Sequence, residues 1–405
     1  MIEPFRSDFN ARFTDAKYQE LLRRLDAETG TKVEFRVAET PCFFEPAFLQ
    51  RMVDAGVELT EQLLGNAEYM RASDAAIPAE YCVPGQNAHP HFMTVDFGLV
   101  RGKNGELEPK LVEMQAFPSI FGYQPIVARA YKEVFDLDPS LTYLLDGMTE
   151  EEYWGTLRET IVAGHDPKNV VLAEVEPEKQ KTLPDFLMHQ KMLGIQIVDV
   201  AKLVKEGNKL FYRDSAGKLE RVERIYNRVI VDDVVRQGVV LPFDYRDELE
   251  VEWAGHPNWY FRISKFSIPH LRHATVPAAV FLDDWFEGRG RDRLPEDRTQ
   301  WVFKPLYSFA GKGIQFEPSD ADLEAVPVRE RHDYLLQERV HFEPVIRTPE
   351  GMTQAEIRIL YAWPDGGRMR PMTSLVRMGR GLMMGVDYNR DRTWVGGSAG
   401  LCPPM

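Results

Sequence analysis

The sequence predicts a mixed α/β protein that contains a parallel α/β unit and a set of antiparallel strands. The apolar run Asn169–Ala173 precedes an amphipathic helix over Lys181–Leu193, and a second apolar run follows at Ile195–Val200. This strand–helix–strand order is typical of parallel sheets. The final third alternates apolar strands with turn-rich segments such as Trp363–Gly367, which favours antiparallel pairing.

Composition narrows the class of protein. The chain has 405 residues, with 44% hydrophobic and 28% charged residues, as in soluble globular proteins. Its net charge of −14 argues against general nucleic-acid binding. The sequence shows no apolar run long enough to span a bilayer. Three cysteines, Cys42, Cys82 and Cys402, favour a reducing, cytoplasmic location.

We expect three regions along the chain. Residues 1–150 begin with helices and end in a pair of strands. Residues 151–260 form the parallel α/β domain, which includes a hairpin turn at Ser215–Gly217 and a third strand at Arg224–Val231. Residues 261–405 hold the later strands, after a charged loop at Glu287–Thr299. The strands expected there span Trp301–Pro305, Tyr334–Val340, Glu356–Trp363 and Met372–Met378.

The segment Phe92–Phe121 is the most informative stretch. Asn104-Gly105 is a strong hairpin signal, because a tight two-residue turn needs a positive φ at both positions. A tight turn there would place Asp96 directly across from Glu113. Like charges opposite each other in a sheet repel, and a bound cation would remove that repulsion.

The neighbours of these two acids point to a magnesium site. Side chains alternate along a strand, so Gln115 lies on the face of Glu113, and Thr94 on that of Asp96. Oxygen ligands of this kind suit Mg²⁺. The alternative is a solvated hairpin face with two unrelated acids. The apolar segment Ala116–Gly122 favours the metal site, because it places the acids beside a buried corner.

The segment Trp301–Phe316 is a candidate phosphate-binding region. Lys304 lies within a strand, and we expect its ammonium to project inward. In the following loop, Gly311, Lys312 and Gly313 would let backbone N–H groups approach phosphate oxygens. The alternative is a simple hairpin turn, since the loop is not a Walker motif.

Later strands supply further candidates. Tyr334–Val340 ends in polar residues that could meet an adenine ring, although an ordinary strand end is the alternative. Glu356 and Arg358 share a strand face, and Arg377 lies near the end of the next strand. The two arginines could therefore approach a triphosphate. The small residues of Trp394–Leu401 make a poor strand or helix, and we expect a loop that closes over a nucleotide.

The order of these motifs resembles the ATP-grasp superfamily, in the circularly permuted form of eukaryotic-type glutathione synthetases. The metal hairpin comes first and the lid last, as in that branch. The resemblance runs in order from Phe92 to Leu401. Its motifs here are VDFGLV with KLVEMQAFPSIFG, AEVEPEKQ, YNR, RISKF, VFKP, GKG, LLQERV, AEIRIL, LVRM and VGGSAG.

The resemblance implies an ATP-grasp fold with an antiparallel sheet and lid, an inserted parallel α/β substrate domain, and ATP and Mg²⁺ as cofactors. The implied metal residues are Asp96, Glu113 and Gln115; the implied ATP-binding residues are Lys265, Lys304, Gly311, Lys312, Gly313, Gln337, Glu338 and Val340. Arg358 and Arg377 would be catalytic, and Glu174, Gln180, Arg228 and Ser119 would bind substrate.

The implied reaction phosphorylates a carboxylate with ATP, and an amine then attacks the acylphosphate to form an amide. The partners would be small amino-acid or peptide substrates, with a homodimer as the assembly to test. Several positions depart from the family: Gln115 replaces asparagine, Ser308 an acidic lid residue, Thr94 an arginine, Glu176 an asparagine, and Gly379 a lysine. We therefore do not expect γ-glutamylcysteine and glycine as substrates.

Two alternatives to a ligase remain open at this point. The first is a nucleotide-binding protein that has lost or altered its activity, as the changed metal positions suggest. The second is a phosphotransferase on the same fold, whose product would be a stable phosphoester. Mass spectrometry of the product separates a phosphoester from an amide.

Overall fold

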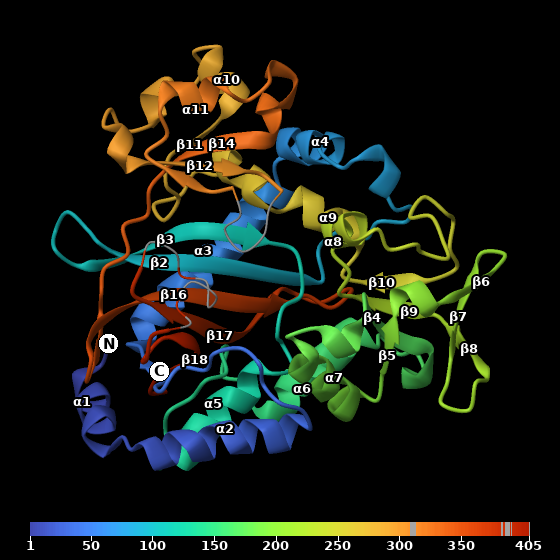
Figure 1. Cartoon of the computed structure of the whole chain (residues 1–405), viewed down its shortest axis with the longest axis horizontal. Helices are drawn as coiled ribbons and strands as arrows, with labels where there is room; N and C mark the ends of the chain where they lie inside the picture. The colour runs from blue at the N-terminus through green and yellow to red at the C-terminus, as the bar shows by residue number, and fades with distance from the viewer. Residues whose placement is uncertain (308–312, 382–383, 385–388, 390, 405) are drawn as a thin grey trace.

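A computed structural model describes residues 1–307, 313–381, 384, 389 and 391–404, without the side chains of 232 and 233. Its centre is a seven-stranded sheet in the order β1-β18-β17-β16-β2-β3, with β15 paired to β16 (Figure 1). These strands span β1 (Cys42–Phe43), β2 (Phe92–Arg101), β3 (Leu107–Gln115), β15 (Ile346–Thr348), β16 (Gly351–Ala362), β17 (Arg370–Gly379) and β18 (Gly396–Leu401).

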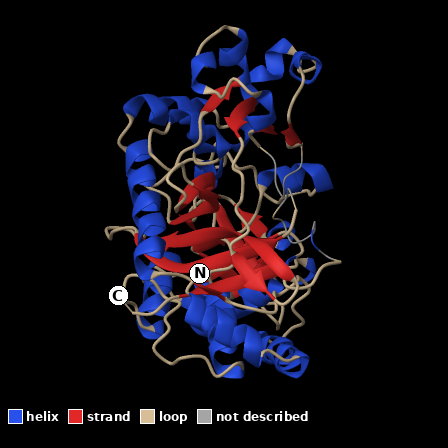
Figure 2. Ribbon diagram, turned by 90° about the vertical axis from the view of Figure 1, so that its left-hand side faces the viewer, coloured by secondary structure: helices blue, strands red, loops and turns tan. Residues whose placement is uncertain are grey.

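Helices cover the central sheet, and two apolar clusters fill the core (Figure 2). The N-terminal helices that the sequence predicts are confirmed. In α2, the Thr14 side chain accepts from Lys17 N and Gly30 ends the helix at φ 76°, as capping rules predict. The helices span α1 (Glu3–Arg12), α2 (Asp15–Thr29), α3 (Pro46–Leu64), α4 (Ala67–Ala75), α5 (Gln124–Val134) and α6 (Glu150–Ile161).

The predicted parallel unit is confirmed as a four-stranded sheet in the order β10-β9-β4-β5, in which every pairing is parallel. The predicted third strand is shorter than expected, because the chain enters a helix at Val231. A small antiparallel sheet, β6-β7-β8, extends from this domain. The elements are β4 (Val170–Glu174), α7 (Leu183–Leu193), β5 (Gln196–Asp199), β6 (Val204–Glu206), β7 (Lys209–Arg213), β8 (Leu219–Val222), β9 (Arg224–Asn227), α8 (Val231–Gln237), β10 (Glu252–Ala254) and α9 (Pro257–Arg262).

A third sheet, β11-β14-β12-β13, is antiparallel, and lies above the central sheet in Figure 1. Its elements are β11 (Ala279–Phe281), α10 (Leu282–Phe286), β12 (Trp301–Pro305), β13 (Gln315–Phe316), α11 (Asp320–Glu324) and β14 (Tyr334–Glu338). Short 3-10 helices span Ala79–Tyr81, Pro167–Asn169, Pro177–Lys179, Val200–Lys202, Lys265–His270, Arg291–Arg293, Arg298–Gln300 and Val328–Asp333.

The prediction of a loop for the C-terminal glycine-rich segment, Trp394–Leu401, is wrong. We expected a closing loop, but β18 is a strand of the central sheet between β17 and β1. Its small residues fit a crowded site: a Cβ on Gly400 would lie 2.4 Å from Ser374 Oγ, and one on Gly396 2.5 Å from Arg36 O. Glycine is therefore needed at these two positions of β18 because neighbouring atoms leave no room for a side chain.

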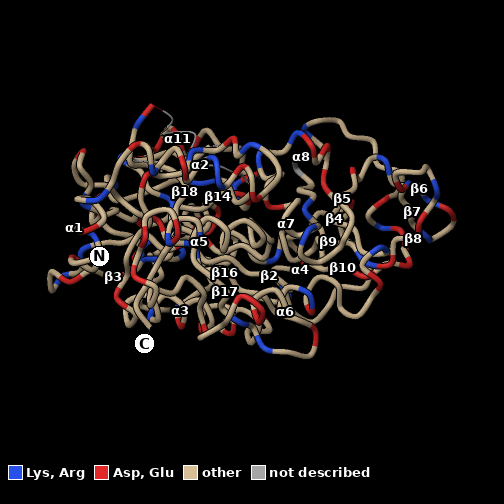
Figure 3. Tube along the Cα trace, turned by 90° about the horizontal axis from the view of Figure 1, so that it is seen from below, with Lys and Arg blue, Asp and Glu red and all other residues tan. Residues whose placement is uncertain are grey.

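No helix in the described part of the chain is long and apolar enough to cross a membrane. Lys and Arg are interspersed with Asp and Glu along the chain trace (Figure 3).

Candidate functional site

A row of charged side chains crosses one face of the central sheet. Asp96 on β2 is in register with Glu113 of β3 on one side and Arg358 of β16 on the other. The Arg358 guanidinium donates to both carboxylate oxygens of Asp96, through Nε at 2.6 Å and Nη2 at 2.7 Å. Arg377 of β17 donates to the same carboxylate. Two-pronged pairing of this kind is among the strongest charged contacts in proteins.

Burial and charge act in opposite directions on these acids. Burial would raise the pKa of Asp96, but Arg358 and Arg377 hold it below its ordinary value. Glu356 also pairs with Arg377. Burial raises the pKa of Glu356 to about 7, against the lowering effect of Arg377. Arg358 and Arg377, the predicted catalytic cations, are thus both engaged by carboxylates in this structure.

The predicted two-residue turn of the hairpin is wrong. Gly102 N donates to Glu106 O at 2.8 Å, and Gly105 N donates to Gly102 O at 2.9 Å. The loop therefore comprises Lys103–Gly105, with Gly105 at φ 82°. The asparagine–glycine signal identified the turn but not its length, because longer loops also place glycine at a positive φ.

The predicted pairing of Asp96 with Glu113 is nevertheless confirmed. An irregularity lies between Asp96 and Phe97, and Phe97 pairs with Leu111, so Val112 is the extra residue on β3. This bulge shifts the register by one residue and offsets the longer loop. Bulges of this kind re-aim side chains near functional sites.

Two lysines approach Glu113 from outside the central sheet. Lys265 follows the capping residue Ser264 in a 3-10 helix, and its Nζ lies 3.6 Å from Glu113 Oε1. Lys304 on β12 projects inward, as predicted, and donates to Gln337 Oε1 at 3.1 Å. Burial lowers the pKa of Lys304 to about 8, with Glu113 opposing the shift. The fold thus buries two cations from separate segments, and one of them pairs with Glu113.

The end of β14 approaches the central sheet. Glu338 Oε2 accepts from Ala278 N at 3.2 Å, so this carboxylate is already hydrogen-bonded to the backbone. Val340 lies directly against β2, since a Cβ on Gly98 would be 2.8 Å from Val340 Cγ1. The contact of Gln337 and Val340 with adenine stays a prediction.

The three predicted metal residues differ in what they could offer a cation. Glu113 and Gln115 lie on one face of β3 and offer a carboxylate and an amide oxygen, which fits Mg²⁺ shared with substrate phosphates. Asp96 does not fit as a ligand in this arrangement, because guanidinium groups hold both its oxygens. Across the described ranges there is no group of three or more His, Cys, Asp or Glu able to hold a metal.

Arg228 lies at the carboxyl edge of the parallel sheet, where its N–H donates to Ala173 O at 3.0 Å. Its side chain is 5% exposed. The guanidinium lies between the rings of Phe117 and Phe186, 5.2 and 5.4 Å from their centroids. Within the described residues, its Nε and Nη1 have no hydrogen-bond partner. A buried cation of this kind is suited to an anionic ligand.

The other predicted substrate residues come from the end of β4 and from two loops. Glu174 ends β4, and its Oε1 accepts from Val175 N at 2.8 Å. Gln180 donates to Val175 O at 2.7 Å, so both side chains gather at one backbone segment. Ser119 is half-buried in the loop after β3, which includes Phe117. Gly311 and Lys312, with Ser308, lie outside the described residues; Gly313 is described, at φ 72°.

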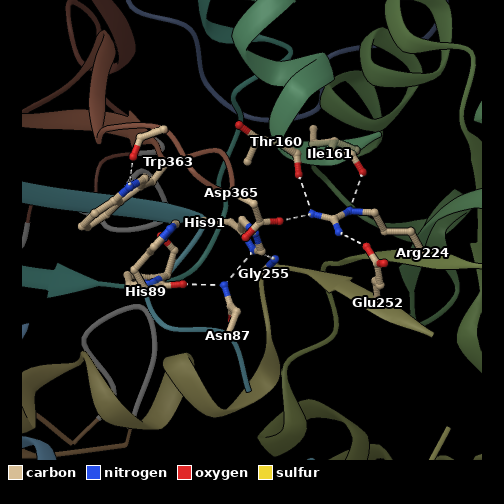
Figure 4. A network of polar contacts seen from close by, with 12 residues as sticks. Asn87, His89, His91, Thr160, Ile161, Arg224, Glu252, Gly255, Trp363 and Asp365 are labelled. Atoms are coloured by element: carbon tan, nitrogen blue, oxygen red, sulfur yellow. Dashed lines mark hydrogen bonds and ion pairs between the residues drawn. The ribbon is translucent and has the colours of Figure 1, made fainter. Parts of the chain in front are cut away.

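A second polar network, which we did not predict from the sequence, lies at the opposite edge of the parallel sheet (Figure 4). Arg224 is 2% exposed and donates to Glu252 at 2.6 Å and to Ile161 O at 3.1 Å. Asp365, from the turn between β16 and β17, lies 3.4 Å from Arg224 and 3.0 Å from His91. This network joins the inserted domain to the central sheet.

A cavity of about 360 Å³ adjoins this network and is lined in part by Arg224, His91, His256 and Asp365. The polar groups of the network bond to one another (Figure 4). We therefore interpret it as a structural connection between domains.

Neither the protein-family models nor the curated proteins give a match. Among solved structures, the chain is similar to a glutathione synthetase-like effector (GSS30) from Globodera pallida in its apo form. The TM-score is 0.61 at 12% identity, and the match covers 96% of each chain. The chain therefore has a glutathione synthetase-like fold, in agreement with the fold that its motifs predict.

Proposed function

We propose that this protein is an ATP-dependent ligase that joins a carboxylate to an amine. The observation that carries this proposal is a pair of buried lysines beside the charged row of the central sheet. Lys265 Nζ lies 3.6 Å from Glu113 Oε1, and Lys304 donates to Gln337 at 3.1 Å. Phosphoryl transfer depends mainly on positioning and charge neutralisation. Two buried cations beside a carboxylate suit that chemistry, and the glutathione synthetase-like fold supports it.

Each set of residues has a proposed task. Lys265 and Lys304 would neutralise the phosphates. Glu113 and Gln115 would hold Mg²⁺, which neutralises charge on the transferred phosphoryl group when bound. The carboxylate of the acid substrate would reach Arg228. The remaining ATP contacts are proposed at Gln337, Glu338, Val340 and Gly313.

The guanidinium groups of the row have a positioning role in this scheme. Arg358 fixes Asp96 through two hydrogen bonds, and Arg377 links Asp96 to Glu356. A fixed row of alternating charges needs little rearrangement when a phosphate develops charge. We propose that Arg377, whose side chain is only partly buried, faces the substrate from its place in this row.

The test is ADP formation by the purified protein with pairs of amino acids and short peptides. We expect ADP release that requires both substrates, and a loss of at least about 100-fold in Glu113→Ala. Glu106→Ala, at the exposed tip of the same hairpin, is the matched control and should keep wild-type turnover. Absence of Mg-ATP binding by calorimetry would refute the proposal.

A nucleotide-binding protein without ligase activity is the second candidate, favoured by the engagement of Asp96 with two arginines. That candidate predicts Mg-ATP binding with no ADP from any substrate pair. In that case Glu113→Ala would weaken nucleotide binding but would have no turnover to abolish.

A further inference from the structure

A second and larger cavity, of about 930 Å³, lies between α4 and the third sheet (Figure 1). Its walls come from α4 and the residues after it, from the 3-10 helix Lys265–His270, from the ends of β11, β12 and β14, and from the 3-10 helix before β14. Among the described residues that line it there is none of the charged row of the central sheet. The cavity is therefore separate from the candidate site, and its size is that of a small-molecule pocket.

Aromatic rings and small apolar side chains form most of this cavity's surface. The rings are those of Phe266, Phe281, Tyr307 and Tyr334. The first two of them have centroids 5.3 Å apart. Ala72 and Ala75 stand three residues apart, so they share one face of α4 and leave room beside the rings. A surface of this kind fits the flat, apolar body of a small aromatic molecule.

The charged groups on the cavity wall are the carboxylates of Glu330 and Asp333, and no lysine or arginine is among the described residues that line it. Arg331, between these two acids in the chain, stacks instead on the ring of Phe286, 3.5 Å from its centroid. Arg329 pairs with Glu330 at 3.1 Å, but the arginine is 84% exposed, so this pair contributes little. The wall therefore favours a ligand with a positive charge.

Two histidines also line the cavity, and neither opposes a cation at Glu330. Three rings surround His270, with centroids between 5.1 and 5.5 Å from its own; they belong to Tyr69, Phe266 and Phe281. Burial lowers the pKa of His270, so this ring is neutral near neutral pH. His332 is exposed and lies 3.5 Å from Asp333 Oδ1, so its charge acts first on Asp333. Glu330 is thus the carboxylate best placed to bind a cationic group.

We propose that this cavity binds an arylalkylamine, a small molecule with an aromatic ring and a protonated amine. The ring of the ligand packs between the aromatic side chains and the alanine face of α4. Its ammonium group pairs with Glu330, with Asp333 nearby, and the faces of the aromatic rings attract the same charge.

The position of the cavity makes its ligand an effector of the nucleotide site. Phe266 directly follows Lys265, and Pro305 directly follows Lys304; both Phe266 and Pro305 line the cavity. A ligand in contact with both residues therefore changes the backbone next to the two lysines from outside the candidate site. Two sites coupled in this way alter each other's affinity by the same factor. This effector role rests on the proposed function, whereas the binding of the amine does not.

Calorimetry without nucleotide, at about 0.15 M salt to screen the acidic surface, tests the binding site. The probes are 2-phenylethylamine and tryptamine. Their neutral alcohols, 2-phenylethanol and tryptophol, lack the charge, and 3-methylbutylamine lacks the ring. We expect at least one arylalkylamine to bind at least about tenfold more tightly than its alcohol and than 3-methylbutylamine. Binding of neither arylalkylamine, or equal binding of the alcohol or of the aliphatic amine, would overturn the proposal.

Two pairs of variants locate the bound amine. Ala75→Phe fills the cavity and should abolish binding, whereas Ala67→Phe, at an exposed position of the same helix outside the cavity, should keep it. Glu330→Gln should remove the preference for the amine over its alcohol, and Glu324→Gln, at an exposed position of α11, should keep that preference. If Ala75→Phe does not fold, an unchanged preference in Glu330→Gln still overturns the proposal.

The effector role is measured as the Mg-ATP affinity with and without saturating amine. We expect a change of about fivefold or more, which Ala75→Phe should abolish. Binding of the amine with an unchanged Mg-ATP affinity would overturn the effector role. Absence of Mg-ATP binding would refute the proposed ligase instead, and the calorimetry without nucleotide would still decide whether the cavity binds the amine.

Discussion

In the proposed function, Lys304 is a buried cation whose charge a bound nucleotide would change. Burial lowers its pKa to about 8, so about half of the molecules carry the proton at pH 8. Bound phosphates would raise that pKa, because they favour the charged form. We therefore predict net proton uptake when Mg-ATP binds at pH 8, measured by calorimetry in buffers of different ionisation enthalpy. Lys304→Met should abolish the uptake, and Lys103→Met, at the hairpin tip, should keep it.

Arg358 offers a test of stability at the same scale. Asp96 is 2% exposed, and removing one partner of a buried ion pair costs about 3–5 kcal/mol. We predict a loss of that size for Arg358→Met in urea unfolding. Combining it with Asp96→Asn should cost less than the sum of the single changes, by about 1–3 kcal/mol. Arg101→Met on β2, whose partner Glu343 is partly exposed, should cost about 1 kcal/mol or less; an equal loss there would contradict the argument.

At the scale of elements, the contact between β2 and the segment after β14 depends on Gly98. A Cβ there would lie 2.8 Å from Val340 Cγ1 and 2.9 Å from Phe342 Cε1. We predict that Gly98→Ala loses about 1–3 kcal/mol of unfolding free energy and weakens Mg-ATP binding. Gly155→Ala is the matched control, because nothing lies within 4 Å of its added Cβ in α6. That helix should gain about 0.5–1 kcal/mol, and a loss in both variants would contradict the assignment.

The sequence predicted elements best where one local rule dominated. The strand Trp301–Pro305 was predicted at its observed bounds, because a short apolar run there directly follows a charged loop. The hairpin pairing of Asp96 was predicted with the wrong turn, since the bulge at Val112 has no local sequence signal. The strand β18 was missed because its glycines are selected by tertiary packing, which a local propensity does not contain.

In the candidate site too, local sequence patterns predicted some residues, while residues brought together by tertiary packing were missed. Lys304 and Glu113 could be placed on strand faces from alternation alone. The cavity beside α4 could not, because its lining residues come from segments that are distant in sequence. The engagement of Asp96 by Arg358 depends on the pairing of β2 with β16, strands that are distant in sequence.

At the scale of the whole molecule, buried histidines lie where the inserted domain meets the central sheet. His91 precedes β2 and contacts Asp365 at 3.0 Å. His256 caps α9, where its Nδ1 accepts from Asn258 N at 3.3 Å. Burial lowers the pKa of both rings, that of His91 against the opposing effect of Asp365 and that of His256 to about 4.

This arrangement predicts an acid-sensitive fold. An unfolded histidine takes a proton near pH 6.5, whereas buried His256 resists it down to about pH 4. The unfolded state therefore binds more protons in this window, and stability falls as pH falls below 6.5. For His256 the loss between pH 7.5 and pH 5 is about 2 kcal/mol. His256→Asn can keep the helix cap, because asparagine is a good capping residue. In urea unfolding at the two pH values, this variant should lose about 2 kcal/mol less than the wild type; an equal loss in both proteins would show that the acid sensitivity arises elsewhere.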